Sequence, residues 1–272
     1  MTTADQVIAV PSAPLLSHRT VVLLGRCSFG ILLLLGWQWG ADSFGSIFFA
    51  PPLAVLQRLY EITMDGSMFL DIWSTLYVSA IGFVIAVAFG LIIPFTLRLS
   101  PRLTEAVAPY IFWSQGIPKY ALAPWLILWF GIGDVPKIVI VVTQTFYVIF
   151  YNVFAGIRAV DQRLINMGRV CGASERAIAK EVIWKSLQPF FYAGMKIAAP
   201  HAVGATIVGE FLVSTQGVGH YIEHARELSD TVGVFAGIVV ATVLVLVINA
   251  IVEKMERISL AWRPVAKDMT AN

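Results

Sequence analysis

The sequence has few of the charged residues that keep a soluble protein in water. Charged residues make up 13% of its 272 positions, about half the share found in an ordinary soluble domain. The formal net charge is +2, so the overall charge gives no argument for nucleic-acid binding. Most of the surface is therefore expected to face something other than water.

Cysteine and nucleotide-binding motifs are also scarce. The two cysteines, Cys27 and Cys171, are far apart in the chain, which excludes a disulfide scaffold and a cysteine-based zinc ribbon. The pattern G-x-x-x-x-G-K-[ST] does not occur in these residues. The sequence therefore excludes a Walker-type nucleotide site within them.

Hydrophobic residues are abundant: they make up 58% of the chain, and the mean hydropathy is +0.77. A helix needs about 20 mainly apolar residues to cross a hydrocarbon core about 30 Å thick. The sequence predicts an all-α polytopic membrane protein with about six transmembrane helices. The six apolar stretches are residues 21–39, 72–97, 106–130, 138–157, 190–213 and 232–252.

The first stretch has a second interpretation, because Arg26 interrupts it and a signal peptide is a short apolar segment near the N-terminus. The leading region is long and contains Pro11 and Pro14, and the exit at Trp39 lacks a small residue where a cleavage site needs one. A membrane span is the favoured prediction.

The distribution of Lys and Arg predicts the orientation. With the N-terminus inside, fourteen of the 19 basic residues fall in cytoplasmic segments and three in outer ones. Both termini are therefore expected in the cytoplasm. The predicted organisation is a cytoplasmic tail over 1–20, a transmembrane domain over 21–264 with a cytoplasmic loop at about 158–189, and a cytoplasmic tail over 265–272.

The loop at 158–189 is long enough to have its own structure. It contains nine charged residues, and two runs of apolar residues flank Gly172. These runs have helical spacing, and glycine is a common break between helices. The pattern predicts a helix, a glycine turn and a second helix.

Several motifs follow one another in a specific order. They are Asn166-Met167-Gly168-Arg169-Val170-Cys171-Gly172-Ala173-Ser174, Ile117-Pro118-Lys119-Tyr120-Ala121-Leu122-Ala123-Pro124, Gly156-Ile157-Arg158-Ala159-Val160-Asp161, Gly209-Glu210, Gly217-Val218-Gly219 and Trp262-Arg263-Pro264. The first resembles the EAA loop of permease subunits of ATP-binding-cassette (ABC) importers, and the set resembles the nitrate, sulfonate, taurine and bicarbonate branch of that family. The resemblance covers about residues 50–264.

The resemblance implies a fold like that of type I ABC importers and a location in the inner membrane of a prokaryote. It implies a non-catalytic permease that forms a pathway for a small anionic solute, such as a sulfonate, nitrate or bicarbonate. Its implied partners are an ATP-binding subunit that holds ATP and magnesium, an extracytoplasmic solute-binding protein, and a second permease subunit, identical or different. The short helix after Gly172 would be the coupling helix. The implied coupling residues are Arg169, Gly172, Ala173, Ser174, Glu175, Arg176 and Lys180.

The loop departs from the family motif at Asn166, Gly168 and the pair Trp184-Lys185. Pro189 is kept and is expected to end the loop before the fifth span. A basic loop that merely satisfies the positive-inside rule is the simpler alternative.

Ionisable residues within membrane spans are costly and often mark pathways. The four candidates are Lys119, Lys196, His201 and Glu210. Gln115, Lys119 and Tyr120 lie in a proline-broken span and are predicted to line the pathway, with snorkelling of Lys119 as the alternative. Glu210 either lines an outer gate or caps a neighbouring backbone segment.

Two further functions are compatible with parts of the sequence. His220, Glu223 and His224 match the H-x-x-E-H pattern of some zinc proteases, which allows an intramembrane metalloprotease. A secondary carrier coupled to an ion gradient is the other alternative, although such carriers usually show two similar halves, and none is evident here.

Overall fold

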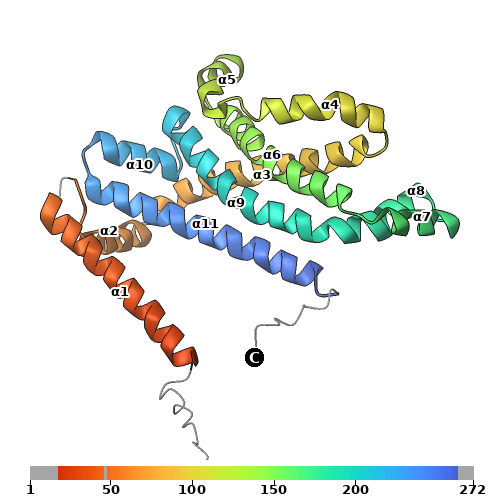
Figure 1. Cartoon of the computed structure of the whole chain (residues 1–272). Helices are drawn as coiled ribbons and strands as arrows, with labels where there is room; N and C mark the ends of the chain where they lie inside the picture. The colour runs from red at the N-terminus through yellow and green to blue at the C-terminus, as the bar shows by residue number, and fades with distance from the viewer. Residues whose placement is uncertain (1–17, 46–47, 263–272) are drawn as a thin grey trace, which may run out of the picture.

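The computed structural model describes residues 18–45 and 48–262 (Figure 1). The tails predicted at 1–20 and 265–272 lie wholly or mostly outside these residues, as does Arg263-Pro264 of the last motif. Within the described part of the chain, every regular element is a helix. This agrees with the predicted all-α fold.

Among the described residues, five helices are long and apolar enough to cross a membrane, and each covers one of the predicted spans. The 39-residue helix from Glu175 to Val213 consists of α8 (Glu175–Ala177), the π-helical η2 (Ile178–Trp184) and α9 (Lys185–Val213). The other four are α1 (His18–Phe44), α3 (Met68–Leu97), α6 (Asp134–Arg158) and α11 (Thr231–Ser259).

The span predicted at 106–130, described from its prolines as a broken one, is not a continuous helix. The segment instead forms α4 (Pro101–Ser114), the 3₁₀ turn η1 (Lys119–Leu122) and α5 (Ala123–Phe130). Pro118 precedes η1, and a proline removes a backbone donor and disfavours helix in the residue before it. The prolines of this span therefore indicated a break, and the structure places it at residues 115–118.

The broken segment still crosses the bundle, because α3 and α6 run parallel. Gly82 lies against Val141, and Gly90 lies against Ile149. Two parallel neighbours require the chain between them to return across the same thickness, and the α4–η1–α5 segment is that return (Figure 1). The structure therefore has five continuous crossings and one broken one.

Helix α9 occupies the centre of the bundle. It packs antiparallel to α6, with Gly156 against Phe190 at one end and Gly209 against Lys137 at the other. Its small residues are buried: Ala198, Ala199, Ala202 and Ala205 are at most 2% exposed. Small side chains permit close helix approach in lipid, which explains why α9 can lie at the centre of the bundle.

Short helices mark the two ends of the bundle (Figure 1). Helices α2 (Pro52–Met64) and α10 (Val218–Glu227) lie at one end, which we call the α10 end. Helix α7 (Gln162–Val170) lies at the other, the α7 end. The α7 end also contains the last turn of α11, because Tyr192 of α9 donates to Ser259 over 2.6 Å.

Candidate functional site: the α7 turn and the broken third crossing

The predicted helix–glycine–helix turn is present at the α7 end. Gly172 has a φ of +77°, and no atom lies within 4 Å of the position that a Cβ would occupy there. The glycine is therefore required by backbone conformation and not by lack of space. Ser174 accepts a hydrogen bond of 3.3 Å from the backbone of Ala177 and caps the following helix.

The helix after Gly172 is not the short one that was expected. It continues through η2 and α9 to Val213 over 39 residues, roughly 58 Å at 1.5 Å per residue. Pro189, expected to end the loop, lies inside α9. The separate short helix is α7, which lies before the glycine. The turn is thus attached directly to one end of the long helix that spans the bundle.

Helix α7 has apolar residues on two opposite faces. Ile165 is 9% exposed and belongs to a buried cluster with Ile178 and Ile183. Met167 and Val170 face outward and are 61% and 88% exposed. The inner face attaches α7 to the bundle, and the outer face leaves an unpartnered apolar surface within the described chain.

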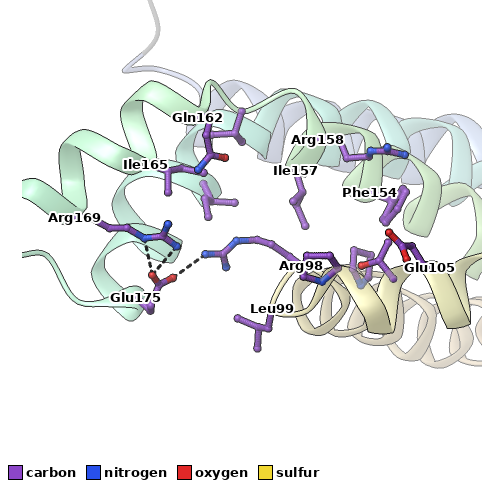
Figure 2. Close-up of a pocket in the computed structure, with 15 residues that line it drawn as sticks. Arg98, Leu99, Glu105, Phe154, Ile157, Arg158, Gln162, Ile165, Arg169 and Glu175 are labelled. Atoms are coloured by element: carbon purple, nitrogen blue, oxygen red, sulfur yellow. Dashed lines mark hydrogen bonds and ion pairs between the residues drawn. The ribbon is translucent and has the colours of Figure 1, made fainter.

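An ion cluster of three residues lies at the C-terminal end of α7 (Figure 2). Glu175 accepts from Arg98 over 3.2 Å and from Arg169 over 2.9 Å. Arg98 ends α3 and is far from the loop in sequence. The sequence near Arg98 gives no signal for its partner, because Glu175 lies 77 residues further along the chain.

The ion cluster borders a cavity of about 750 Å³. One wall comes from the corner between α3 and α4, including Leu99 and Thr104, and the other from α7, including Gln162 and Ile165 (Figure 2). The corner and α7 are thus separated by open volume next to the ion pair between Arg98 and Glu175.

The remaining predicted coupling residues are near the same turn. Ala173 is half-buried and packs against the core cluster that contains Ile165. Arg176 and Lys180 are exposed, and Lys180 lies 4.0 Å from Glu181. The structure therefore brings Arg169 and Glu175 into direct contact and leaves Arg176 and Lys180 on the surface.

The predicted pathway residues Gln115, Lys119 and Tyr120 lie at the break in the third crossing. The Lys119 ammonium donates to the backbone oxygen of Gln115 over 2.6 Å and lies 4.8 Å from the centre of the Tyr147 ring. Tyr147 is near the middle of α6 and donates to Ser114 over 3.0 Å. Lys119 therefore lies level with the middle of α6.

Glu210 is buried at the α10 end, with 1% exposure. It accepts from the Thr75 hydroxyl over 2.8 Å and from the backbone N–H of Gly219 over 2.8 Å. Thr75 in turn accepts from the backbone of Val218, and Asp71 accepts from that of Gly217. This geometry favours the capping alternative for Glu210 over the predicted lining role.

The other intramembrane cation and the histidine pattern have structural explanations. Lys196 forms an ion pair with Glu256 of α11. Glu223 of the H-x-x-E-H pattern pairs with Arg226, and this contact lowers the pKa of the Glu223 carboxyl, whereas a general base needs a pKa near the working pH. Among the described residues, no group of three His, Cys, Asp or Glu side chains could hold a metal, so a metalloprotease is not favoured.

In the described residues, five continuous crossings and one broken one pack with α9 at their centre, which is the architecture of a polytopic helical membrane protein. The chain belongs to the family described as binding-protein-dependent transport system inner membrane component, whose model matches residues 82–258. It is thus a multi-pass inner-membrane permease subunit of an ABC importer that contributes to the translocation pathway for a small solute. A secondary carrier is not favoured.

Curated relatives agree over most of the chain. The formylaminopyrimidine transport permease protein ThiX of Halalkalibacterium halodurans is 29% identical, covering 90% of this chain and 98% of its own length. The riboflavin transport system permease protein RibX of Chloroflexus aurantiacus is 31% identical, covering 85% and 87%. The putative aliphatic sulfonates transport permease protein SsuC of Bacillus subtilis is 30% identical, covering 78% and 77%.

A solved structure supports the fold. An inward-facing conformation of the MetNI methionine ABC transporter aligns with a TM-score of 0.61 at 20% identity, covering 68% of this chain and 92% of that chain. At this identity the likeness shows the fold alone, which is that of type I ABC importer permeases.

Proposed function

We propose that this chain docks on a separate ATP-binding subunit through α7 and pairs with a second permease subunit, identical or different, to enclose a solute pathway. The observation that carries the proposal is the outer face of α7, where Leu164, Met167 and Val170 are 43%, 61% and 88% exposed. Apolar residues at these spacings suit insertion of a helix into a groove of another protein. ATP and magnesium are held by that partner, and this chain is not catalytic by itself.

The basic residues support the same orientation. Arg98, Arg158, Arg169 and Lys185 all lie at the α7 end, at or beyond the ends of membrane helices. The positive-inside rule makes this the cytoplasmic end. The α10 end is then extracytoplasmic, where a solute-binding protein delivers its ligand.

The pathway is supported by the break at residues 115–118. Gln115, Gly116, Ile117 and Pro118 are all exposed in the single chain, yet Lys119 beside them lies level with the middle of α6. Non-helical backbone at this depth is tolerated only where protein or a water-filled cavity covers it. The second permease subunit and the pathway between the two subunits supply that cover.

The charge of Lys119 supports a small anionic solute. The relatives' names refer to solutes as different as a formylaminopyrimidine, aliphatic sulfonates and riboflavin. An ammonium at mid-membrane depth attracts a sulfonate or carboxylate more than a neutral ring. A sulfonate-like anion, first selected by the binding protein, is therefore the proposed cargo.

Reconstitution tests the proposal. The chain is co-expressed with the ATP-binding and solute-binding proteins from neighbouring reading frames and inserted into liposomes. Uptake is expected to need ATP and to be indifferent to an uncoupler. Uptake by the chain alone, abolished by an uncoupler, would favour the secondary carrier instead.

A further inference from the structure

The ion cluster at Glu175 links two parts of the fold that the chain itself connects only distantly. Arg98 is the last residue before the α3–α4 corner, and Glu175 opens the helix after the Gly172 turn. Their charged groups are 3.2 Å apart. Of the ion pairs between described residues, this is the one that joins the α3–α4 corner to the Gly172 turn.

The corner on the Arg98 side is stiff. Thr104 of α4 donates to the backbone oxygen of Leu97 in α3 over 2.7 Å, and Ser100 caps α4 by accepting from Leu103. A displacement of Arg98 therefore moves α4 along with the end of α3. Helix α4 leads directly to Ser114 and the break that contains Lys119.

A second cation orients Glu175 on the side of the Gly172 turn. Arg169 at the end of α7 holds the other Glu175 oxygen at 2.9 Å. Glu175 thus has one oxygen toward α7 and the other toward α3. The cavity between α7 and the corner leaves room for the two to move relative to each other if this link is lost.

We infer that Glu175 is a positioning residue that transmits displacement of α7 to the α3–α4 corner through Arg98, so that the ATPase acts on the broken third crossing as well as on α9. The inference rests on the proposed function. It assigns a role to a carboxylate in a loop where the first acidic residue of the family motif is replaced by Asn166.

The exposure of the ion pair between Arg98 and Glu175 indicates that the pair transmits movement and adds little to the stability of the fold. The Glu175 side chain is 55% exposed and that of Arg98 is 15% exposed. Ion pairs with one well-exposed partner contribute little to stability. Loss of the pair is therefore expected to change coupling while leaving folding and assembly in place.

A charge exchange tests the link in the assembled complex. Arg98→Glu and Glu175→Arg each place like charges together, and the double variant restores opposite charges. We expect each single variant to lower solute-stimulated ATP hydrolysis, and uptake per ATP hydrolysed, about fivefold or more. The double variant is expected to recover at least half of both, with unfolding midpoints unchanged throughout.

Arg102→Glu is the matched control, because Arg102 is an exposed cation at the same corner. It is expected to behave like the unmodified complex. Single variants with normal coupling, or a double variant as impaired as the singles, would overturn the inference. An unmodified complex that does not assemble or respond to solute would instead contradict the proposed function.

Discussion

The two ends of the bundle are held together in different ways. At the α10 end, Glu210 is 1% exposed and joins α9 to α3 and to the backbone of the first turn of α10. At the α7 end, Glu175 joins α8 to α3 and α7, but its side chain is 55% exposed and a cavity of about 750 Å³ lies beside it.

This difference has an energetic consequence. A buried donor left without a partner costs about 1–3 kcal/mol, so the α10 end resists rearrangement. An exposed ion pair contributes about 0–1 kcal/mol, so the α7 end can reorganise at low cost. Under the proposed function, the movable part lies where the ATPase would act and the fixed part lies at the other end.

The largest expected effect is at the fixed end. Glu210→Ala leaves the Thr75 hydroxyl and the Gly219 N–H without their acceptor, at a combined cost of about 2–6 kcal/mol. We expect a clear fall in the midpoint of thermal unfolding in detergent. Glu227→Ala on the exposed surface of α10 is the control, and equal midpoints for the two variants would contradict the comparison.

The next effect is at the α7 turn. Gly172→Val forces a β-branched residue into a left-handed conformation, which costs about 1–2 kcal/mol, although the site has space for the side chain. We expect lower solute-stimulated ATP turnover with normal membrane insertion. Gly172→Asn should retain most turnover, because asparagine tolerates this conformation. If the valine and asparagine variants have equal ATP turnover, the backbone conformation of the Gly172 turn does not affect coupling.

A smaller effect is expected midway between the two ends. Lys119→Met removes an attraction between charges that, in contact with water, contributes about 0–1 kcal/mol, so anion uptake should fall by up to about fivefold while assembly is unchanged. Lys119→Arg keeps the charge and should retain more uptake. Unchanged uptake in the methionine variant would mean that the solute does not pass this side chain.

The smallest effect is expected on the surface of α10. Because Arg226 lowers the pKa of Glu223, the pair is fully formed above the ordinary carboxyl pKa and is lost only as pH falls through the lowered value. Acidification from about pH 7 to about pH 5 should therefore leave this pair intact. Added zinc should not change the unfolding midpoint. A rise of that midpoint with zinc would instead support a metal site at the H-x-x-E-H pattern.

Much of the coupling turn could be predicted from local sequence. Apolar runs flanking Gly172 have helical spacing, and a glycine between two such runs indicates a turn wherever it lies in the fold. The length of the second helix could not be predicted, because Pro189 is accommodated inside α9 and does not end the loop. Only its place in the packed bundle shows that the helix continues.

By itself, the sequence determined the five continuous spans and the helix–glycine–helix turn at Gly172. These follow from hydrophobicity, charge and side-chain size, which act over a few residues. Only the tertiary structure decided that Glu210 meets Thr75, that Arg98 meets Glu175, and that the third crossing is broken yet still returns across the bundle. Such contacts join residues far apart in the chain, and they depend on how whole helices pack against one another.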